Sequence, residues 1–348
     1  MSVKYIPVQW VPTKYVYDAV LLVCVAVYIL VFLRLGTPAA DFTRPVDGAI
    51  LRMRAFGTCA FLMLTLILCI GPLAQLDRRF LPLLYNRRHF GVLTALVALT
   101  HAVYVLNWYY AFSPTPPLEA LFYSNTSFGQ FLGFPFEAFG IFALVVLGIL
   151  AATSHDFWLA FLSAPVWKRL HLLIYPAYLA VVAHILLGYL QDTKNPTFAL
   201  IAGAGALGVA GLHLAAWARR PEKQASQEDW VEVPHWREIA DGRARIVSLG
   251  GDERAAVFRG GQKLSAVSNA CAHQNGPLGE GRIIDGCITC PWHGFQYRPG
   301  DGCSPPPFTE KSPTYRLKLD GERLFIDRNG YPPGTAVEPL AIPEGALR

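Results

Sequence analysis

The hydrophobic pattern divides the chain into a long apolar part and a shorter polar part. Turn-forming or charged segments, such as Gly36-Thr-Pro38 and Asp77-Arg-Arg79, separate apolar stretches of about twenty residues, each long enough to cross a bilayer as a helix. There are six such stretches, at 16–35, 54–74, 89–110, 134–153, 169–190 and 196–217. The pattern predicts an α-helical bundle of six transmembrane helices.

After residue 229 the pattern changes to short runs of β-type residues bounded by turns, which is typical of strands. We expect these strands at 245–249, 255–258, 264–267, 283–284, 295–297, 315–319 and 324–326. The predicted fold class is a multi-domain membrane protein, in which a six-helix transmembrane bundle precedes a small all-β domain. The expected boundaries are 1–218 for the bundle, 219–229 for a polar linker, 230–330 for the β domain and 331–348 for a Pro-rich C-terminal tail.

Composition supports a membrane protein, because 53% of the 348 residues are hydrophobic and only 16% are charged. The net charge of +5 is modest and gives no reason to expect a nucleic-acid partner. Membrane lipid is the expected partner of the apolar part. Seven cysteines do not indicate a disulfide framework, since three of them lie in apolar stretches.

The distribution of Lys and Arg predicts the orientation of the bundle. With a cytoplasmic N-terminus, eleven basic residues lie inside and five outside, which favours both termini inside. The inside residues are Lys4, Lys14, Arg78, Arg79, Arg87, Arg88, Lys168, Arg169, Arg219, Arg220 and Lys223. The outside residues are Arg34, Arg44, Arg52, Arg54 and Lys194. The β domain is therefore expected on the cytoplasmic side.

The most specific motif lies in the β-type part. Cys271-Ala-His273 is followed, after sixteen residues, by Cys290-Pro-Trp-His293, so each segment supplies one thiolate and one imidazole. Two Cys and two His form the ligand set of a Rieske [2Fe–2S] cluster, in which two His replace two Cys on one iron. A structural zinc site can use the same residue types. Zinc fingers, however, usually pair Cys with Cys and His with His, so the mixed pairs favour the cluster.

The residues around these ligands resemble the two cluster-binding loops of the Rieske family. The similar segments are Gly276-Pro-Leu278 and Cys290-Pro-Trp-His-Gly294, and the likeness extends from Trp230 to Asp327. Pro305-Pro-Pro307 stands where this family has the proline loop that covers the cluster. Two loop positions that carry disulfide-forming cysteines in the cytochrome bc members are Gly276 and Trp292 here, which makes the domain similar to the ferredoxin type.

This resemblance implies the role of each ligand. Cys271 and Cys290 would hold the inner iron, and His273 and His293 would hold the outer iron. The exposed edges of the two histidines would then admit or release electrons.

Ionisable residues within membrane spans are uncommon and usually functional. The helical part contains His89, His101, His155, His171, His184 and His213. His101 and His184 lie at matched depths in the third and fifth spans, and His89 and His171 lie at the cytoplasmic starts of the same spans. Two such pairs could hold two b-type haems. A single histidine is more often structural, and His155 and His213 are alternative ligands for an inner haem.

Helix geometry tests these pairs. Thirteen residues from His171 to His184 correspond to a rise of about 20 Å and a turn of roughly 140°. Pro176 lies between them and can kink the helix, which could bring both histidines to one side. His89 and His101 are roughly 120° apart without an intervening proline.

The same segments resemble the ferric reductase-like transmembrane domain of NADPH oxidases, ferric reductases and the haem subunit of bacterial methionine sulfoxide reductase. The resemblance covers about residues 50–190. It rests on Arg87-Arg-His-Phe-Gly91 together with His101, and on Trp167-Lys-Arg-Leu-His171 together with His184. It implies b-type haem and a multi-pass protein of the bacterial inner membrane. In this chain a Rieske domain follows the sixth span in place of the flavin- and NADPH-binding domain of that family.

Together these features predict one-electron transfer between a cytoplasmic-face Rieske cluster and transmembrane haems. The expected partners are a soluble cytoplasmic electron donor and an extracytoplasmic acceptor, and an electron-transfer oxidoreductase is the favoured activity. Alternatives are a redox-sensing or assembly subunit of a larger complex, a quinol-oxidising protein, and a Rieske oxygenase. The oxygenase is disfavoured because its second iron needs two His and a carboxylate, and no His follows His293.

Overall fold

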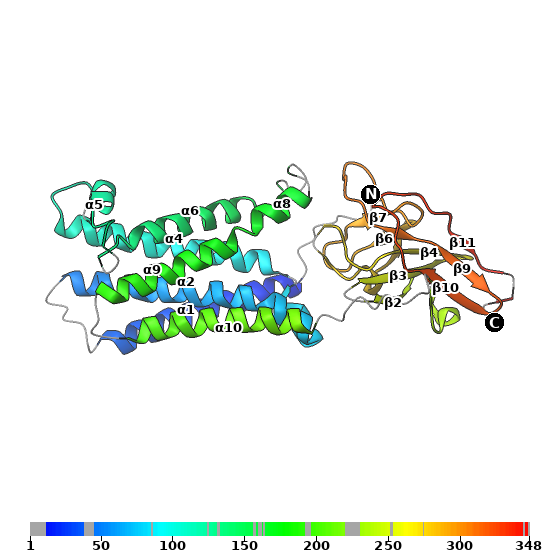
Figure 1. Cartoon of the computed structure of the whole chain (residues 1–348), viewed down its shortest axis with the longest axis horizontal. Coiled ribbons are helices and arrows are strands. Elements are labelled where there is room, and N and C mark those ends of the chain that lie inside the picture. Colours follow the sequence, from blue (N-terminus) through cyan, green and yellow to red (C-terminus); the bar gives the residue numbers. More distant parts are fainter. Residues whose placement is uncertain are drawn as a thin grey trace. The chain divides into compact units, whose positions relative to one another are not determined.

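The fold consists of two compact units, one helical and one built of β-strands (Figure 1). The helical unit comprises residues 11–159 and 166–219, and the β unit lies mainly within 220–348. The computed structural model describes residues 12–37, 45–84, 86–123, 125–130, 133–155, 158, 162, 164–191, 196–219, 230–250, 253–273, 275–343 and 345–346.

Long helices run alongside one another in the helical unit (Figure 1). The main ones are α1 (Pro12–Gly36), α2 (Pro45–Leu76), α4 (Arg87–Phe112), α6 (Glu137–Ala152), α9 (Ile174–Gln191) and α10 (Thr197–Ala218). Short elements connect them, namely η2 (Arg78–Phe80), α3 (Leu81–Leu84), α5 (Pro117–Tyr123) and α8 (Ala164–His171). Proline opens α1, α2 and α5, because its fixed φ and missing N–H suit the first turn of a helix.

Five helical segments within the described residues are long and apolar enough to cross a membrane: Lys14–Gly36, Asp47–Leu76, Arg87–Trp108, Val166–Tyr189 and Thr197–Ala218. They correspond to five of the six predicted spans. The remaining one, predicted at 134–153, contains the shorter helix α6 of 16 residues. A helix of that length rises about 24 Å, a few ångströms less than the hydrocarbon core of a bilayer.

The fifth predicted span is interrupted where Pro176 affects the backbone. Helix α8 ends at His171, a turn covers 172–173, and α9 begins at Ile174. Proline cannot donate to the carbonyl four residues before it and its ring clashes with that carbonyl, so the helix breaks just before it. The break lies between His171 and His184, as the sequence indicated.

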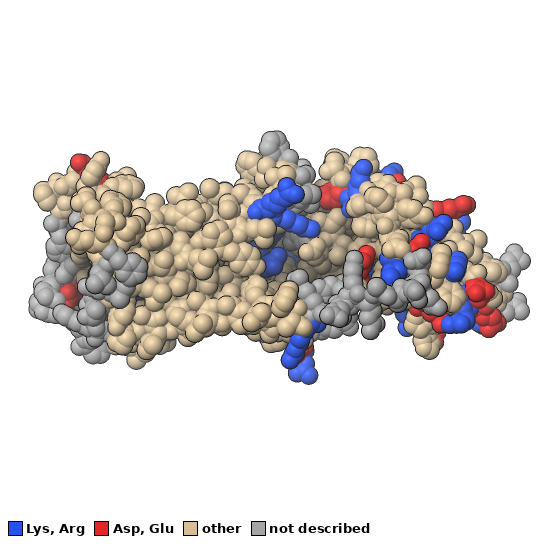
Figure 2. Space-filling model, viewed as in Figure 1, with Lys and Arg blue, Asp and Glu red and all other residues tan. Residues whose placement is uncertain are grey.

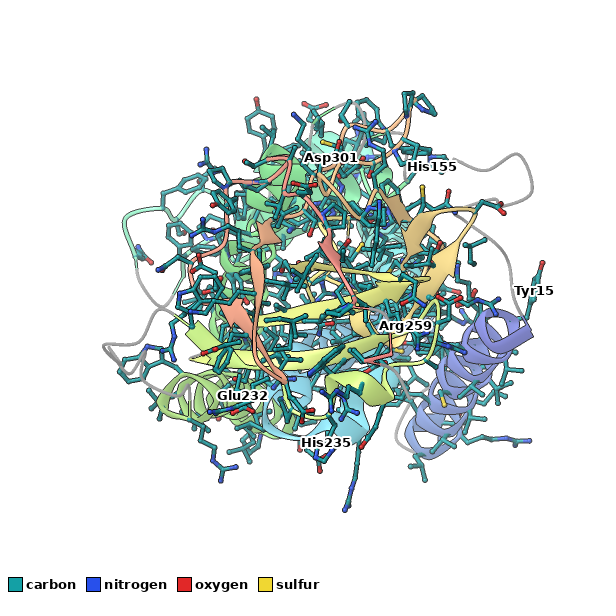
Figure 3. All side chains as sticks on the ribbon, turned by 90° about the vertical axis from the view of Figure 1, so that its right-hand side faces the viewer. Tyr15, His155, Glu232, His235, Arg259 and Asp301 are labelled. Atoms are coloured by element: carbon teal, nitrogen blue, oxygen red, sulfur yellow. The ribbon has the colours of Figure 1, made fainter. Side chains whose placement is uncertain are left out.

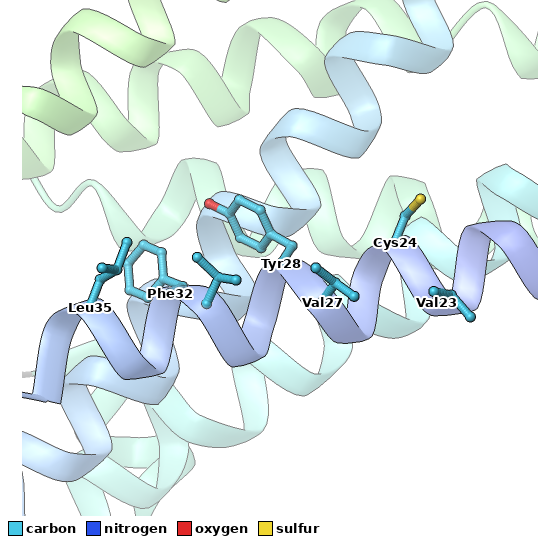
Figure 4. Close-up of a pocket in the computed structure, with 7 residues that line it drawn as sticks. Val23, Cys24, Val27, Tyr28, Phe32 and Leu35 are labelled. Atoms are coloured by element: carbon cyan, nitrogen blue, oxygen red, sulfur yellow. The ribbon is translucent and has the colours of Figure 1, made fainter.

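The lateral surface of the helical unit is apolar. Leu35 and Leu207 are each 76% exposed, and Figure 2 shows a face of this unit with few charged residues between its ends. A shallow groove on α1 is lined by Val23, Cys24, Val27, Tyr28, Val31, Phe32 and Leu35 (Figure 4). Such a surface is stable in lipid and not in water, which agrees with a multi-pass membrane protein.

Small residues lie where the helices approach closely. Ala55, Ala177 and Ala202 are fully buried, and Phe61 stacks on Tyr178 with ring centroids 5.8 Å apart. The hydroxyl groups of Tyr178 and Thr65 are 3.0 Å apart and share a hydrogen bond. Small residues and buried polar contacts of this kind hold transmembrane helices together.

The described residues of the β unit form three small antiparallel sheets, with strand orders β1-β10-β9, β11-β4-β3-β2 and β5-β6-β7. Strand β8 pairs with β4 beside the second sheet. The strands are β1 (Trp230–Glu232), β2 (Ala244–Gly250), β3 (Glu253–Gly260), β4 (Lys263–Ser268), β5 (Arg282–Ile284), β6 (Cys287–Thr289), β7 (Gln296–Tyr297), β8 (Thr314–Tyr315), β9 (Leu317–Asp320), β10 (Arg323–Asp327) and β11 (Leu340–Ala341). In the end-on view of Figure 3, Asp301 lies toward the top of this unit and His235 toward the bottom.

Strand β3 separates two hydrophobic cores. Ala255 and Val257 belong to one core, and Ala256 and Phe258 belong to the other. Side chains alternate across a strand, so a strand buried on both faces contributes to a core on each side. The second core includes Cys271 and Cys290, which places the cluster motif against a packed sheet.

Two expectations for the β unit need correction. The predicted strand at 315–319 is divided, because β8 pairs with β4 whereas β9 pairs with β10. The expected C-terminal tail from 331 is part of the domain, since Leu340 pairs with Leu264 of β4 and Ile342 is buried in the first core. The two residues of β11 carry no strand signal of their own, because their partner strand β4 is far away in the chain.

Candidate functional site

The two cluster loops have the same construction. Cys271 follows β4, Cys290 follows β6, and each Cys carbonyl accepts a hydrogen bond from the backbone N–H four residues later. The donors are Asn275 at 2.7 Å and Gly294 at 3.0 Å, and both have positive φ, of 61° and 68°. Asn and Gly tolerate this left-handed conformation. The two turns bring the thiol and imidazole of each loop to the same end of the domain.

The thiols of Cys271 and Cys290 are buried next to each other in the second core. Burial raises the pKa of the Cys271 thiol, but hydrogen bonding with Cys290 and Tyr297 outweighs this effect and lowers it. Hydrogen bonding to Cys271, together with burial, raises the pKa of the Cys290 thiol. A Cβ atom at Gly276 would be 2.7 Å from Cys290 Sγ, so a side chain at this position would displace the sulfur from its present place.

Tyr297 contributes a hydrogen bond that sequence analysis missed. Its hydroxyl oxygen lies 3.2 Å from Cys271 Sγ and accepts a hydrogen bond from the backbone N–H of His273 at 3.3 Å. Because the oxygen accepts from the backbone, its own proton is free to point toward the sulfur. A β-strand tyrosine carries no local signal for this role, since Tyr297 and Cys271 are 26 residues apart.

The imidazoles of His273 and His293 have the spacing of two ligands on one metal ion. Their ring centroids are 5.2 Å apart and the rings are nearly perpendicular, at 81°. With metal–nitrogen bonds of about 2.0 Å, two imidazoles on one tetrahedral ion have centroids roughly 5 Å apart, and two on opposite sides of an ion roughly 6.3 Å apart. The observed distance matches the tetrahedral arrangement.

The four residues form a thiol pair and an imidazole pair, and they do not converge on one point. Among the described residues, which include all four, no three His, Cys, Asp or Glu side chains gather as ligands of a single ion. A zinc site requires four ligands around one ion, whereas a [2Fe–2S] cluster takes two thiolates on one iron and two imidazoles on the other. The arrangement fits the cluster better than zinc.

The two histidines differ in exposure, which corrects one expectation. His273 is only 1% exposed and stacks on Phe295, with centroids 4.4 Å apart and planes at 10°. His293 is half-buried. The sequence predicted two exposed histidine edges, but Phe295 follows the second loop and covers the ring of His273. Only the edge of His293 therefore remains accessible.

In the helical unit the structure brings His101 and His184 together. Their ring centroids are 6.4 Å apart and their planes are at 85°, which matches two imidazoles on opposite sides of one metal. His101 Nδ1 is 2.8 Å from the carbonyl oxygen of Met53, and His184 Nδ1 is 2.9 Å from that of Phe136. A carbonyl only accepts, so both Nδ1 atoms donate and both Nε2 atoms keep the lone pair that a haem iron requires.

His89 and His171 are not brought together in this way. His89 Nδ1 lies 2.7 Å from Asp18 Oδ2, while His171 Nδ1 donates to the carbonyl of Trp167 at 3.0 Å. No ring contact joins the two histidines among the described residues. The Nε2 atom of His171 is buried without a hydrogen-bond partner in this part of the chain, so its lone pair remains available.

The alternative inner ligands are placed unfavourably. His213 donates from Nδ1 to the Val209 carbonyl at 2.9 Å, so its Nε2 accepts the hydrogen bond from the Tyr175 hydroxyl at 3.2 Å. That bond occupies the lone pair that an iron would need. His155 is exposed at the end of the helical unit. His235, outside the membrane part, pairs with Glu238 at 2.9 Å.

Comparison with known families identifies both parts of the chain. Residues 229–316 match the Rieske [2Fe-2S] domain, and residues 56–182 match the ferric reductase like transmembrane component. The resemblance inferred from the two motifs is confirmed. The matched segments contain the cluster motif in the first case and His89, His101 and His171 in the second.

Known proteins are similar to this chain over about three tenths of its length. Human apoptosis-inducing factor 3 is 29% identical over 110 residues, which are 30% of this chain and 18% of that protein. The ferredoxin component of the naphthalene 1,2-dioxygenase system of Pseudomonas aeruginosa is 28% identical over 103 residues, 29% of this chain and 96% of that protein. The solved ferredoxin of carbazole 1,9a-dioxygenase from Nocardioides aromaticivorans is 21% identical, with a TM-score of 0.27, and the match covers 29% of this chain and 98% of that one.

Proposed function

We infer that this chain, a ferric reductase-like transmembrane domain followed by a Rieske [2Fe–2S] domain, carries single electrons between the cluster and a b-type haem within the membrane. Cys271, Cys290, His273 and His293 would hold the cluster, and His101 and His184 would hold the haem. The haem would supply one-electron chemistry by changing between its ferric and ferrous states, and the cluster would do the same.

The observation that supports this function most directly is the pair formed by His101 and His184. Two imidazoles with centroids 6.4 Å apart face each other inside an apolar helical bundle. Burying two histidines among apolar side chains is costly unless they have a partner. An iron between the two Nε2 atoms would supply that partner, and it would also explain why both Nδ1 atoms are directed to carbonyl groups.

The Rieske domain exchanges electrons with a soluble partner through His293, whose ring is the accessible one. The almost complete coverage of the dioxygenase ferredoxin supports an electron-carrier domain, since that relative is named as a ferredoxin component. Several other relatives are named as oxygenase components. An oxygenase requires a further iron site, and no such cluster of ligands occurs among the described residues.

The expected route leads from a soluble cytoplasmic donor to the cluster, then to the haem and then to an acceptor outside the membrane. The distribution of Lys and Arg supports a cytoplasmic Rieske domain. The resemblance to the bacterial methionine sulfoxide reductase subunit supports a location in the bacterial inner membrane. A second haem held by His89 and His171 stays a prediction of the sequence.

A spectroscopic redox titration of the purified full-length protein tests this function. We expect two separable one-electron components, the electron paramagnetic resonance signal of a reduced mixed-ligand [2Fe–2S] cluster and the visible absorption bands of a b-type haem. Their midpoint potentials would give the downhill direction. Stoichiometric zinc in place of iron in the β unit, or membrane protein purified without haem, would contradict the proposal.

A further inference from the structure

The hydrogen bonds that orient His101 and His184 are two copies of one arrangement. In each case the histidine Nδ1 donates to a backbone carbonyl on a neighbouring helix, Met53 of α2 for His101 and Phe136 just before α6 for His184. The distances are 2.8 and 2.9 Å, and the donor and acceptor are 48 residues apart in both cases. The pairs α2–α4 and α6–α9 therefore present their histidines in the same way.

A glycine stands four residues after each acceptor. A Cβ atom at Gly57 would be 2.8 Å from Nδ1 and 3.0 Å from Cε1 of His101. A Cβ atom at Gly140 would be 2.8 Å from Nδ1 and 2.9 Å from Cε1 of His184. Real Cβ atoms essentially never approach ring atoms so closely, so each imidazole occupies the space that a side chain would fill.

The position of these glycines has a simple geometric cause. A helix carbonyl points along the axis toward the residue four positions later, whose N–H it normally accepts. At both sites the histidine that donates to this carbonyl lies against the residue four positions later, where a Cβ atom would be 2.8 Å from its Nδ1. The Phe136 carbonyl illustrates the shared acceptor, because it takes a long hydrogen bond of 3.4 Å from the Gly140 N–H as well as the one from His184.

We propose that Gly57 and Gly140 are positioning residues for the haem. Each glycine lets a histidine donate Nδ1–H to a helix carbonyl, and this fixes the tautomer and the ring so that both Nε2 atoms face one iron. The proposal rests on the proposed function, because it requires a haem between His101 and His184. Gly57 and Gly140 are thereby added to the haem site. Neither has a side chain that could bind a metal or a proton, so a search of the sequence for ligands does not find them.

The test compares Gly57→Ala and Gly140→Ala with two control variants on the same helices, Gly71→Ala in α2 and Gly148→Ala in α6. Nothing lies within 4 Å of a Cβ at either control position. Alanine is the better helix former, so helix propensity predicts no loss in any of the four variants. Loss of an outer contact that orients a metal ligand typically weakens metal binding roughly 10- to 100-fold, and we expect a loss of this size in haem affinity for the first two variants alone.

The measurements are haem per chain by pyridine haemochrome, the electron paramagnetic resonance line shape of the ferric haem, and elution from a size-exclusion column. Reduced haem content or an altered line shape in monodisperse Gly57→Ala and Gly140→Ala, with both controls like the wild type, supports the proposal. Wild-type content and line shape in both variants would overturn it. Aggregation of both variants beside monodisperse controls would also overturn it, because the glycines would then serve helix packing. Absence of haem from the wild-type protein would instead refute the proposed function.

Discussion

The imidazole rings of His101 and His184 are nearly perpendicular, at 85°, and their centroids are 6.4 Å apart. Each ring is held on its own helix pair by a hydrogen bond to a carbonyl, so this angle is set by the protein. If both rings ligate one ferric iron, perpendicular planes leave two of the iron d orbitals close in energy. We therefore expect a strongly anisotropic ferric signal with one dominant low-field feature in electron paramagnetic resonance. A well-resolved three-line spectrum would indicate parallel rings and contradict this geometry.

Removal of either histidine should empty the haem site. His101→Ala and His184→Ala each leave only one imidazole of the pair, and no other histidine makes a ring contact with this pair in the described residues. We expect haem content, measured as pyridine haemochrome per chain, to fall to a small fraction of the wild type in both variants. His155→Ala is the control, because His155 is exposed at the end of the helical unit. If His101→Ala and His184→Ala keep the haem content of the wild type, as His155→Ala is expected to do, this ligand pair is ruled out.

The number of haems can be decided at His89 and His171. Among the described residues, His101 and His184 are in ring contact, whereas His89 and His171 are not. We therefore expect about one haem per chain, and His89→Ala and His171→Ala should keep it. If the wild type holds two haems and either variant loses one of them, the two-haem prediction of the sequence is correct.

The cluster potential should depend on Tyr297. Its hydroxyl lies 3.2 Å from Cys271 Sγ, and a hydrogen bond to a cluster sulfur stabilises the more negative, reduced state. A hydrogen bond has a net worth of about 0.5–1.5 kcal/mol, so for a one-electron couple Tyr297→Phe should lower the midpoint potential by about 20 to 60 mV. Tyr315→Phe is a matched control, since Tyr315 is buried and its hydroxyl donates to Glu253 at 3.1 Å. A shift of equal size in both variants would assign the effect to packing.

Local patterns in the sequence were sufficient for five of the six predicted membrane spans and for the cluster motif. Apolar stretches reveal helices that lipid must surround. The four residues of the cluster motif, from Cys271 to His293, lie in two neighbouring loops, so their spacing is visible in the sequence. The contacts that define the environment of these sites come from distant residues and were not predicted. Asp18 reaches His89 across 71 positions, and Phe295 covers His273 only after the second loop has folded back. Long-range packing decides these contacts, so a single sequence gives no signal for them.

The orientation of the chain in the membrane is the remaining prediction. Basic residues near span ends stay on the cytoplasmic side. Arg87 and Arg88 begin α4, Lys168 and Arg169 lie in α8, and Arg219 follows α10. Six passes through the membrane would return the chain to its starting side, so a reporter fused after Arg348 should be active only in its cytoplasmic form. The same reporter after residue 125, in the segment between α5 and α6, should be active only in its extracytoplasmic form. The opposite pattern in both fusions would place the Rieske domain outside and reverse the proposed route from a cytoplasmic donor.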